Sequence, residues 1–297
     1  MRIIGHRVIQ ERLDRLAGEQ SHPQSFLFVG PESVGKRLVA LRFAWSLVDR
    51  DDAFDFRGEE ELEHPDISLL IPERVTEKGK TREKNIPVEA VRENIGFLSR
   101  YPLVGKKRVL IIDDAHRLSH GAQNALLKTL EEPNETSILI LVTHDAAALL
   151  DTVHSRLQRV PFSLVREEEM SGLGILDHED RFLLSFGRPG VVTEALRDTE
   201  GFSSTKVFLR RLSNLRELPV SERLRLAEDL SRESVSVTRL LEWLISLIRQ
   251  DALDEAQQER IPSGYRFLED IVKAQRILRG TQANTRLQLE KLFLRAC

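Results

Sequence analysis

The feature that most constrains the fold is a helical pattern placed between two apolar stretches. Residues 109–114 (VLIIDD) have the pattern of a buried strand that ends in two acids, and residues 137–143 (SILILVT) have the pattern of a second strand. Ser119 can cap the helix between them, and Pro133 stops it. A strand–helix–strand unit predicts a parallel sheet with acids at its carboxyl edge, where α/β proteins often bind nucleotides and metals. The helix face expected to pack on this sheet comprises Ala122, Ala125, Leu126, Thr129 and Leu130.

A second unit near the start of the chain has the pattern of a phosphate-binding loop. A strand over residues 25–30 (SFLFVG) leads into GPESVGKR, and a helical apolar stripe follows. Gly30 and Gly35 would let the backbone approach a phosphate, and Lys36 would add a positive charge at the start of the helix. The spacing alone is weak, but the strand–loop–helix setting favours a nucleotide site.

These motifs together resemble one protein family. The phrase ALLKTLEEP at residues 125–133 follows an acidic strand end and precedes Ser155-Arg156 by about two dozen residues, as in the clamp-loader subunits of bacterial DNA polymerase III. The resemblance covers most of the chain and is strongest over residues 25–162. It implies an α/β AAA+ P-loop domain with a parallel five-stranded sheet over residues 1–164, a small helical lid over 165–203, and an all-α collar or oligomerisation domain over 204–297.

Within this family pattern, the nucleotide site departs from that of an active ATPase. Arg37 stands where a serine or threonine hydroxyl binds Mg²⁺, and a guanidinium cannot ligate a cation. Asp113 matches the metal-side acid, whereas Asp114 stands in place of a longer, water-activating glutamate. Thr143 matches the polar residue that senses the γ-phosphate. We therefore expect ATP or ADP to bind weakly or not at all, without turnover and without a metal site.

Arg156 is the residue on which the resemblance places a function. Clamp loaders carry a Ser-Arg-Cys triplet here, whose arginine reaches the ATP site of the neighbouring subunit as a trans arginine finger. Leu157 replaces the cysteine, which leaves the cation in place. The alternative is an ordinary surface arginine in a loop.

Other segments bear on zinc and DNA. In the resembled family the insertion at residues 49–66 often carries four cysteines around zinc, but Cys297 is the one cysteine of this chain, so we expect no zinc and no disulfide, and a solvated or turn role for His64. The net charge of −3 gives no overall basic field, so any DNA contact must be local. Residues 75–85 predict a polar hairpin or loop, and residues 86–102 a helix whose family counterpart lies beside the DNA backbone.

The two ends of the chain carry weaker signals. Ile4, Val8, Leu13 and Leu16 suggest an opening helix, and Ile4-Gly5-His6 is either an adenine-side box or an ordinary first turn. The predicted lid helices, over residues 167–197, place Gly190 where active relatives carry an arginine, and Arg188 is two residues too early. From residue 205 onward, leucines at helical spacing fit a collar or any helical bundle, with Asn284 as a cap for the last helix.

The family resemblance best fits a delta-prime type of clamp-loader subunit. Its expected partners are gamma/tau and delta subunits, the sliding clamp and primed DNA through phosphate contacts, in the cytoplasm and without a membrane. Three alternatives remain: an active gamma/tau-type ATPase, a stand-alone AAA+ DNA-remodelling ATPase, and a plain nucleotide-binding module. Arg37 opposes the first two, since both need hydrolysis.

Overall fold

The computed structural model divides the chain into two compact units. One comprises Met1–Gly174 with Gly187–Gly190, and the other comprises Ile175–Phe186 with Val191–Cys297. The residues that the structure describes are 3–19, 22–48, 64–77, 80–170, 187–197, 210–212, 214–232, 237, 241, 244–245, 248, 265–280 and 283–296.

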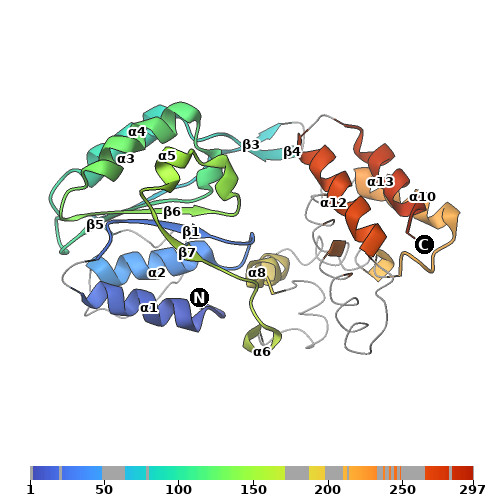
Figure 1. The fold of residues 1–297 in the computed structure, drawn as a ribbon, viewed down its shortest axis with the longest axis horizontal. Coiled ribbons are helices and arrows are strands. Elements are labelled where there is room, and N and C mark those ends of the chain that lie inside the picture. Colours follow the sequence, from blue (N-terminus) through green and yellow to red (C-terminus); the bar gives the residue numbers. More distant parts are fainter. Residues whose placement is uncertain are drawn as a thin grey trace. The chain divides into compact units, whose positions relative to one another are not determined.

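The first unit is organised around a five-stranded parallel sheet in the order β2-β5-β6-β1-β7 (Figure 1). Its register pairs Val29 with Thr143 and Ile112 with Leu141, so the carboxyl ends of β1, β5 and β6 lie at one edge. Every residue of these three strands is buried, as expected of a sheet covered on both faces. The strands are β1 (Ser25–Val29), β2 (Ile67–Leu70), β5 (Arg108–Ile112), β6 (Ser137–Thr143) and β7 (Gln158–Pro161).

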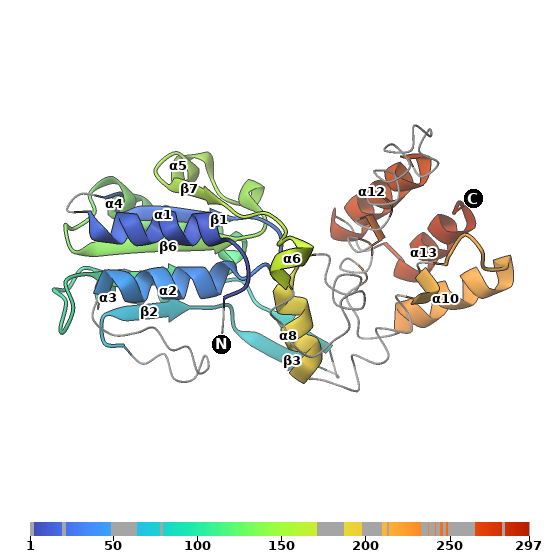
Figure 2. The ribbon, with the colours of Figure 1, turned by 90° about the horizontal axis from the view of Figure 1, so that it is seen from below.

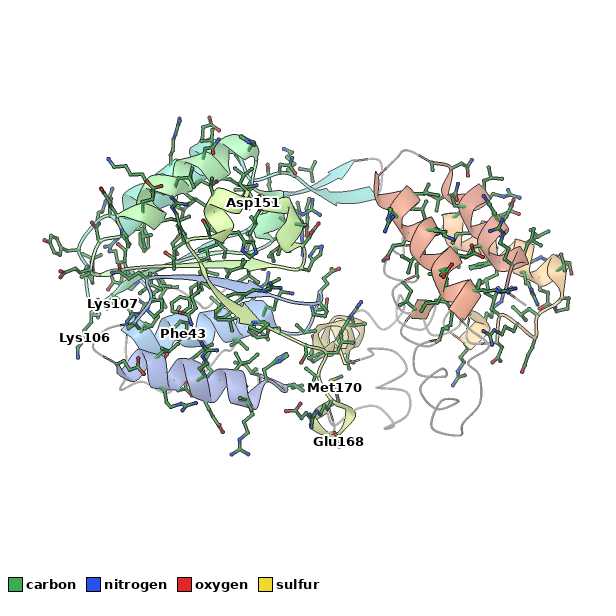
Figure 3. All side chains as sticks on the ribbon, in the orientation of Figure 1. Phe43, Lys106, Lys107, Asp151, Glu168 and Met170 are labelled. Atoms are coloured by element: carbon green, nitrogen blue, oxygen red, sulfur yellow. The ribbon has the colours of Figure 1, made fainter. Side chains whose placement is uncertain are left out.

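Helices cover the two faces of this sheet in separate groups (Figures 1 and 2). On one face, α1 (Arg7–Gly18) and α2 (Lys36–Val48) share a core with alternate residues of the strands. Phe43 of α2 points at the sheet and meets Phe26 edge to face, with ring centroids 5.3 Å apart (Figure 3). The other face is covered by α3 (Val88–Leu98), α4 (His120–Glu131) and α5 (Asp151–His154).

The central helix α4 forms as its sequence predicts. The Ser119 hydroxyl caps it by accepting the Ala122 amide at 3.2 Å, and Leu126 and Leu130 are buried on its inner face. Gln123 is buried as well. Its amide group donates to the carbonyls of Leu118 and Ala148 and accepts the amide of Leu150 at 2.7 Å, which ties α4 to the segment before α5.

A buried carboxylate orders the loop that leads into β5. Asp66 is fully buried and accepts the backbone amides of Leu103, Val104 and Gly105 at 2.7–2.9 Å, while Arg108 lies 3.4 Å away. Burial raises the pKa of Asp66, but the three amide donors and Arg108 outweigh it, so the net pKa lies below its usual value. Lys106 and Lys107 of this loop lie at the edge of the sheet where β5 begins (Figure 3).

Short elements complete the first unit. The polar segment after β2 forms an antiparallel hairpin of β3 (Arg74–Glu77) and β4 (Lys80–Glu83). The turns η2 (Ala115–Arg117) and η3 (Ala146–Ala148) follow β5 and β6, and α6 (Glu167–Met170) follows β7. Helix α8 (Pro189–Arg197) begins in the first unit and continues into the second.

The second unit is helical where it is described. Helices α10 (Val220–Arg232), α12 (Tyr265–Gly280) and α13 (Thr285–Leu294) contribute Leu226, Ile271 and Phe293 to one core. Arg223 is buried and donates to the carbonyls of Arg216, Leu218 and Ala296, which ties α10 to the end of the chain. Asn284 caps α13 as predicted, by accepting the amide of Leu287 at 3.2 Å.

The predicted α/β class with a five-stranded parallel sheet and a helical C-terminal region is confirmed. The opening helix is displaced from its prediction, since α1 begins at Arg7, after Ile4, and Val8 is 77% exposed. The division into lid and collar at residues 164 and 203 stays a prediction. The insertion at 49–63, most of the predicted lid and Cys297 lie outside the described residues. In the described parts of the chain, no helix has the length and apolar character needed to span a membrane.

Candidate nucleotide site and arginine finger

The predicted phosphate loop lies between β1 and α2, at the carboxyl edge of the sheet. Gly30 must be glycine because an added Cβ would lie 2.3 Å from the carbonyl oxygen of Phe162. Gly35 must be glycine for its backbone, since its φ is +97°, and the space in front of it holds no atom within 4 Å of a Cβ. The loop therefore has the strand–turn–helix form of a phosphate loop, with open space at Gly35.

Lys36 is turned onto the loop itself. Its ammonium donates to the carbonyl oxygens of Gly30 at 2.9 Å and Pro31 at 2.5 Å, and the residue is 7% exposed. Burial lowers the pKa of Lys36 to about 8, although the carboxylates of Asp113 and Asp114 favour its charged form. A phosphate would have to compete with these two carbonyls for the ammonium.

Arg37 and Asp113 form an ion pair at the position expected for the metal. The Arg37 Nη1 lies 3.2 Å from the Asp113 Oδ2, and the two side chains are 30% and 13% exposed. Burial and the neighbouring charge of Asp114 raise the pKa of Asp113, while Arg37 acts against this rise. The two positions that hold Mg²⁺ in an active ATPase are thus occupied by an ion pair, so they do not fit a magnesium ion.

Asp114, which follows β5, and Thr143, the last residue of β6, also belong to the predicted site. Asp114 lies in the left-handed backbone region with φ 47°, and burial together with Glu83 raises the pKa of its carboxyl. The Thr143 hydroxyl donates to the Asp145 carbonyl at 3.1 Å and accepts the Asp145 amide at 3.0 Å. The residue predicted as a sensor thus has its hydroxyl engaged in the turn after β6, and it is 1% exposed.

Gly190, near the start of α8, contacts the phosphate loop. Its amide donates to the Ser33 carbonyl at 2.8 Å, and an added Cβ would lie 2.8 Å from that same oxygen. A longer side chain, such as the arginine of active relatives, does not fit this backbone contact. Arg188, which the sequence places two residues too early to match the arginine of the family pattern, lies near enough for its charge to lower the pKa of Lys36.

Arg156 lies at the opposite edge of the sheet. It lies in the turn before β7, and Phe162, whose carbonyl packs on Gly30, directly follows that strand, so the extended residues from Gln158 to Phe162 separate the turn from the loop by about 13 Å. Its Nη2 pairs with Glu131 at 2.8 Å, and its Nη1 donates to the Thr152 carbonyl at 2.8 Å. The Arg156 side chain is 36% exposed. It therefore cannot serve its own loop but is open to solvent.

Several residues of these sites were not singled out by the sequence. Glu131 holds Arg156, and His116 and His144 flank Asp114, with ring centroids 4.2 Å apart. The histidines could have been found, because each follows the carboxyl end of a buried strand. In the N-terminal Ile4-Gly5-His6 segment, His6 contacts the phosphate loop, since its Nε2 lies 3.0 Å from the Val34 carbonyl oxygen.

Comparison with known proteins identifies the family of this chain. A family model described as DNA polymerase III, delta subunit, matches residues 5–166, which is more than half of the chain. The chain belongs to this family. The DNA polymerase III subunit delta' of Pseudomonas aeruginosa is 34% identical over 150 residues, which cover 48% of this chain and 44% of that protein. Subunit tau of Bacillus subtilis is 29% identical over 181 residues, or 57% of this chain and 30% of that one.

The delta-prime assignment made from the sequence is confirmed by the family model and by relatives named delta'. The chain matches about half or less of the length of the first curated relatives. A gamma subunit-related protein of Thermotoga maritima has the same fold, with a TM-score of 0.51 at 18% identity over 97% of this chain and 98% of that one. The family includes subunits named delta', tau and gamma. Whether this chain hydrolyses ATP or supplies an arginine finger depends on single residues, which the family assignment does not decide.

Proposed function

We propose that this protein is a delta-prime-type subunit of the bacterial clamp loader, which donates Arg156 to the ATP site of a neighbouring subunit and does not hydrolyse ATP itself. It acts in the cytoplasm with gamma/tau and delta subunits to load the sliding clamp onto primed DNA. ATP or ADP binds its own loop weakly at most. The partners follow from the family, since its relatives carry the names of DNA polymerase III subunits.

The observation that carries the proposal is the position of Arg156. It is exposed at the amino edge of the sheet, in the turn before β7, and this strand separates the turn from the chain's own phosphate loop by about 13 Å. An arginine so placed can neutralise charge on a transferred phosphoryl group only in another subunit. Its ion pair with Glu131 is exposed, and such pairs contribute only about 0–1 kcal/mol, so a phosphate can replace the carboxylate.

The absence of hydrolysis rests on different residues. Arg37 pairs with Asp113 where Mg²⁺ would bind, and Asp114 replaces the glutamate that activates water. An active gamma/tau-type motor and a stand-alone remodelling ATPase both require this centre. DNA contact is proposed at the start of α3, where Pro87 supplies no side-chain cap and leaves the first amides of the helix to bind phosphate.

The first experiment identifies the partners. The full chain is captured from its source cell, and the proteins bound to it are identified by mass. We expect gamma/tau and delta subunits. Capture of this chain alone as a homohexamer with ATPase activity would instead support the remodelling alternative.

The second experiment tests the donor role in the reconstituted complex. Arg156→Ala should leave assembly intact and lower turnover at the adjoining site by about 10³-fold or more, as for other trans arginines. Arg159→Ala, at an exposed arginine of β7, is the matched control and should retain turnover. Equal turnover of the two variants would contradict the donor role, and steady hydrolysis by the isolated chain would contradict its inactivity.

A further inference from the structure

Three potential metal ligands meet where β5 and β6 end. Ile112 of β5 is paired with Leu141 of β6, so Asp114, two residues later, lies beside Thr143, and His144 follows directly. His116 belongs to the turn η2 after β5. One ligand atom from each of Asp114, His116 and His144 lies within 4.8 Å of the other two.

His116 has a buried ring nitrogen that the protein leaves unsatisfied. Its Nδ1 has no hydrogen-bond partner among the residues that the structure describes, and its side chain is 14% exposed. The nearest oxygen of Asp114 is 3.9 Å away, which is too long for a hydrogen bond. A buried nitrogen of this kind is uncommon in proteins, because leaving it unpaired is costly. A ligand between His116 and Asp114 would satisfy it.

The charges around the cluster permit a cation. Asp114 supplies a carboxylate, and its left-handed backbone, at φ 47°, is a conformation that aspartate adopts only occasionally. Two cations oppose a metal ion near Asp114, namely Arg117 and Lys36. The Arg117 Nε lies 3.0 Å from Glu83, and the Lys36 ammonium donates to the carbonyls of Gly30 and Pro31. Asp145, directly after His144, adds a second negative charge that acts on His116.

Although the sequence led us to expect no zinc and no metal site, we propose that Asp114, His116 and His144 bind one divalent transition-metal ion of the zinc class. Two imidazoles and one carboxylate are ligands typical of such ions, whereas Mg²⁺ prefers oxygen ligands alone. Tetrahedral coordination places ligand atoms roughly 3.3–3.5 Å apart, so the 3.9 Å between His116 and Asp114 needs to shorten by about half an ångström, and a pair at the 4.8 Å limit by about 1.4 Å. Water would complete the fourth position. The ion would join the ends of β5 and β6, and its binding does not depend on assembly into a clamp loader.

The test is metal binding by the full chain after any affinity tag has been removed and the metal stripped with a chelator. Titration with Zn²⁺ in a calorimeter should give one site per chain, and Co²⁺ in its place should give a visible spectrum of nitrogen and oxygen coordination. A large excess of Mg²⁺ should not displace either ion. The melting temperature should rise when Zn²⁺ is added.

Variants separate this site from other histidines. His144→Gln and His116→Gln should each weaken Zn²⁺ binding at least tenfold and abolish the rise in melting temperature. The control His120→Gln changes an exposed histidine of α4 that contacts Asn124 instead, and it should bind as the unmodified chain does. His144→Gln removes the ligand outside the buried turn, so it keeps the test valid if His116→Gln fails to fold. The absence of a one-to-one site, or binding unchanged in His144→Gln, would overturn the proposal.

Discussion

The two edges of the sheet each carry an arginine–carboxylate pair, and the two pairs differ in their environment. At the carboxyl edge, Arg37 and Asp113 are 30% and 13% exposed and lie next to Lys36 and Asp114. At the amino edge, Arg156 and Glu131 are 36% and 51% exposed. The first pair neutralises the charges within a potential metal site, while the second leaves an arginine that can exchange its partner.

The pair at the amino edge lies at the C-terminal end of helix α4. Glu131 is the last residue of α4, where a negative charge is unfavourable because the helix dipole is negative there. Arg156 offsets that charge and also donates to the Thr152 carbonyl of the short helix α5. The pair is thus a resting position for Arg156 that costs about 1 kcal/mol or less to leave. The two arginines are similarly exposed, at 30% and 36%, so the pairs differ mainly in the carboxylate, which is 13% exposed in Asp113 and 51% exposed in Glu131.

The largest effect on stability is expected at a third arginine–carboxylate pair, Arg108 with Asp66, in which both side chains are buried. Asp66→Asn removes the negative partner of Arg108 and disturbs three amide hydrogen bonds, so the free energy of unfolding should fall by about 3–5 kcal/mol. Urea unfolding at neutral pH measures it. Asp14→Asn, in an exposed pair with Arg42, is the control and should change stability by less than about 1 kcal/mol. Equal losses in the two variants would show that burial does not determine how much stability is lost when an ion pair is broken.

A pH dependence of similar size is expected at the carboxyl edge. Burial, with the charges of His144 and Arg117, lowers the pKa of His116 from its ordinary 6.5 to about 4. Between these values the unfolded chain takes up a proton that the folded chain does not, so stability falls as the pH drops from 6.5 to 4. A pKa lowered from 6.5 to about 4 corresponds to a loss of about 3 kcal/mol in the free energy of unfolding over this pH range.

The measurement for His116 is urea unfolding at several pH values in the presence of a chelator. His116→Gln should lose this part of the pH dependence, whereas His120→Gln, which changes an exposed histidine, should keep it. A His116→Gln variant with the same slope as the unmodified chain would contradict the buried neutral imidazole.

The smallest effect is expected at the amino edge. Glu131→Gln should change the free energy of unfolding by no more than about 0.5 kcal/mol, because the pair is exposed. The same variant should leave turnover of the assembled complex unchanged or slightly faster, since Arg156 no longer has to leave a carboxylate. A loss of turnover would mean that Glu131 positions Arg156 for the neighbouring site.

Local sequence patterns predicted most of the fold but fewer of the contacts in the candidate site. Strand periodicity and the Ser119 cap predicted the sheet and α4 because both depend on nearby residues. The loop glycines and the departure at Arg37 were also visible in the sequence. The pairing of Arg37 with Asp113 was not, since 76 positions separate them and sequence gives no side-chain direction. Glu131, Gln123 and Asp66 were missed for the same reason, as each binds partners that only the folded chain brings near.

The most direct test of the account is the effect of Mg²⁺ on nucleotide binding by the isolated chain. Arg37→Thr restores the hydroxyl that ligates magnesium and frees Asp113 from its ion pair. Calorimetric titration with ATP, with and without Mg²⁺, should show that Mg²⁺ strengthens binding to Arg37→Thr by at least about tenfold. The unmodified chain should bind ATP weakly or not at all, with no gain from Mg²⁺. Equal strengthening by Mg²⁺ in both proteins would contradict the claim that Arg37 occupies the place of the metal.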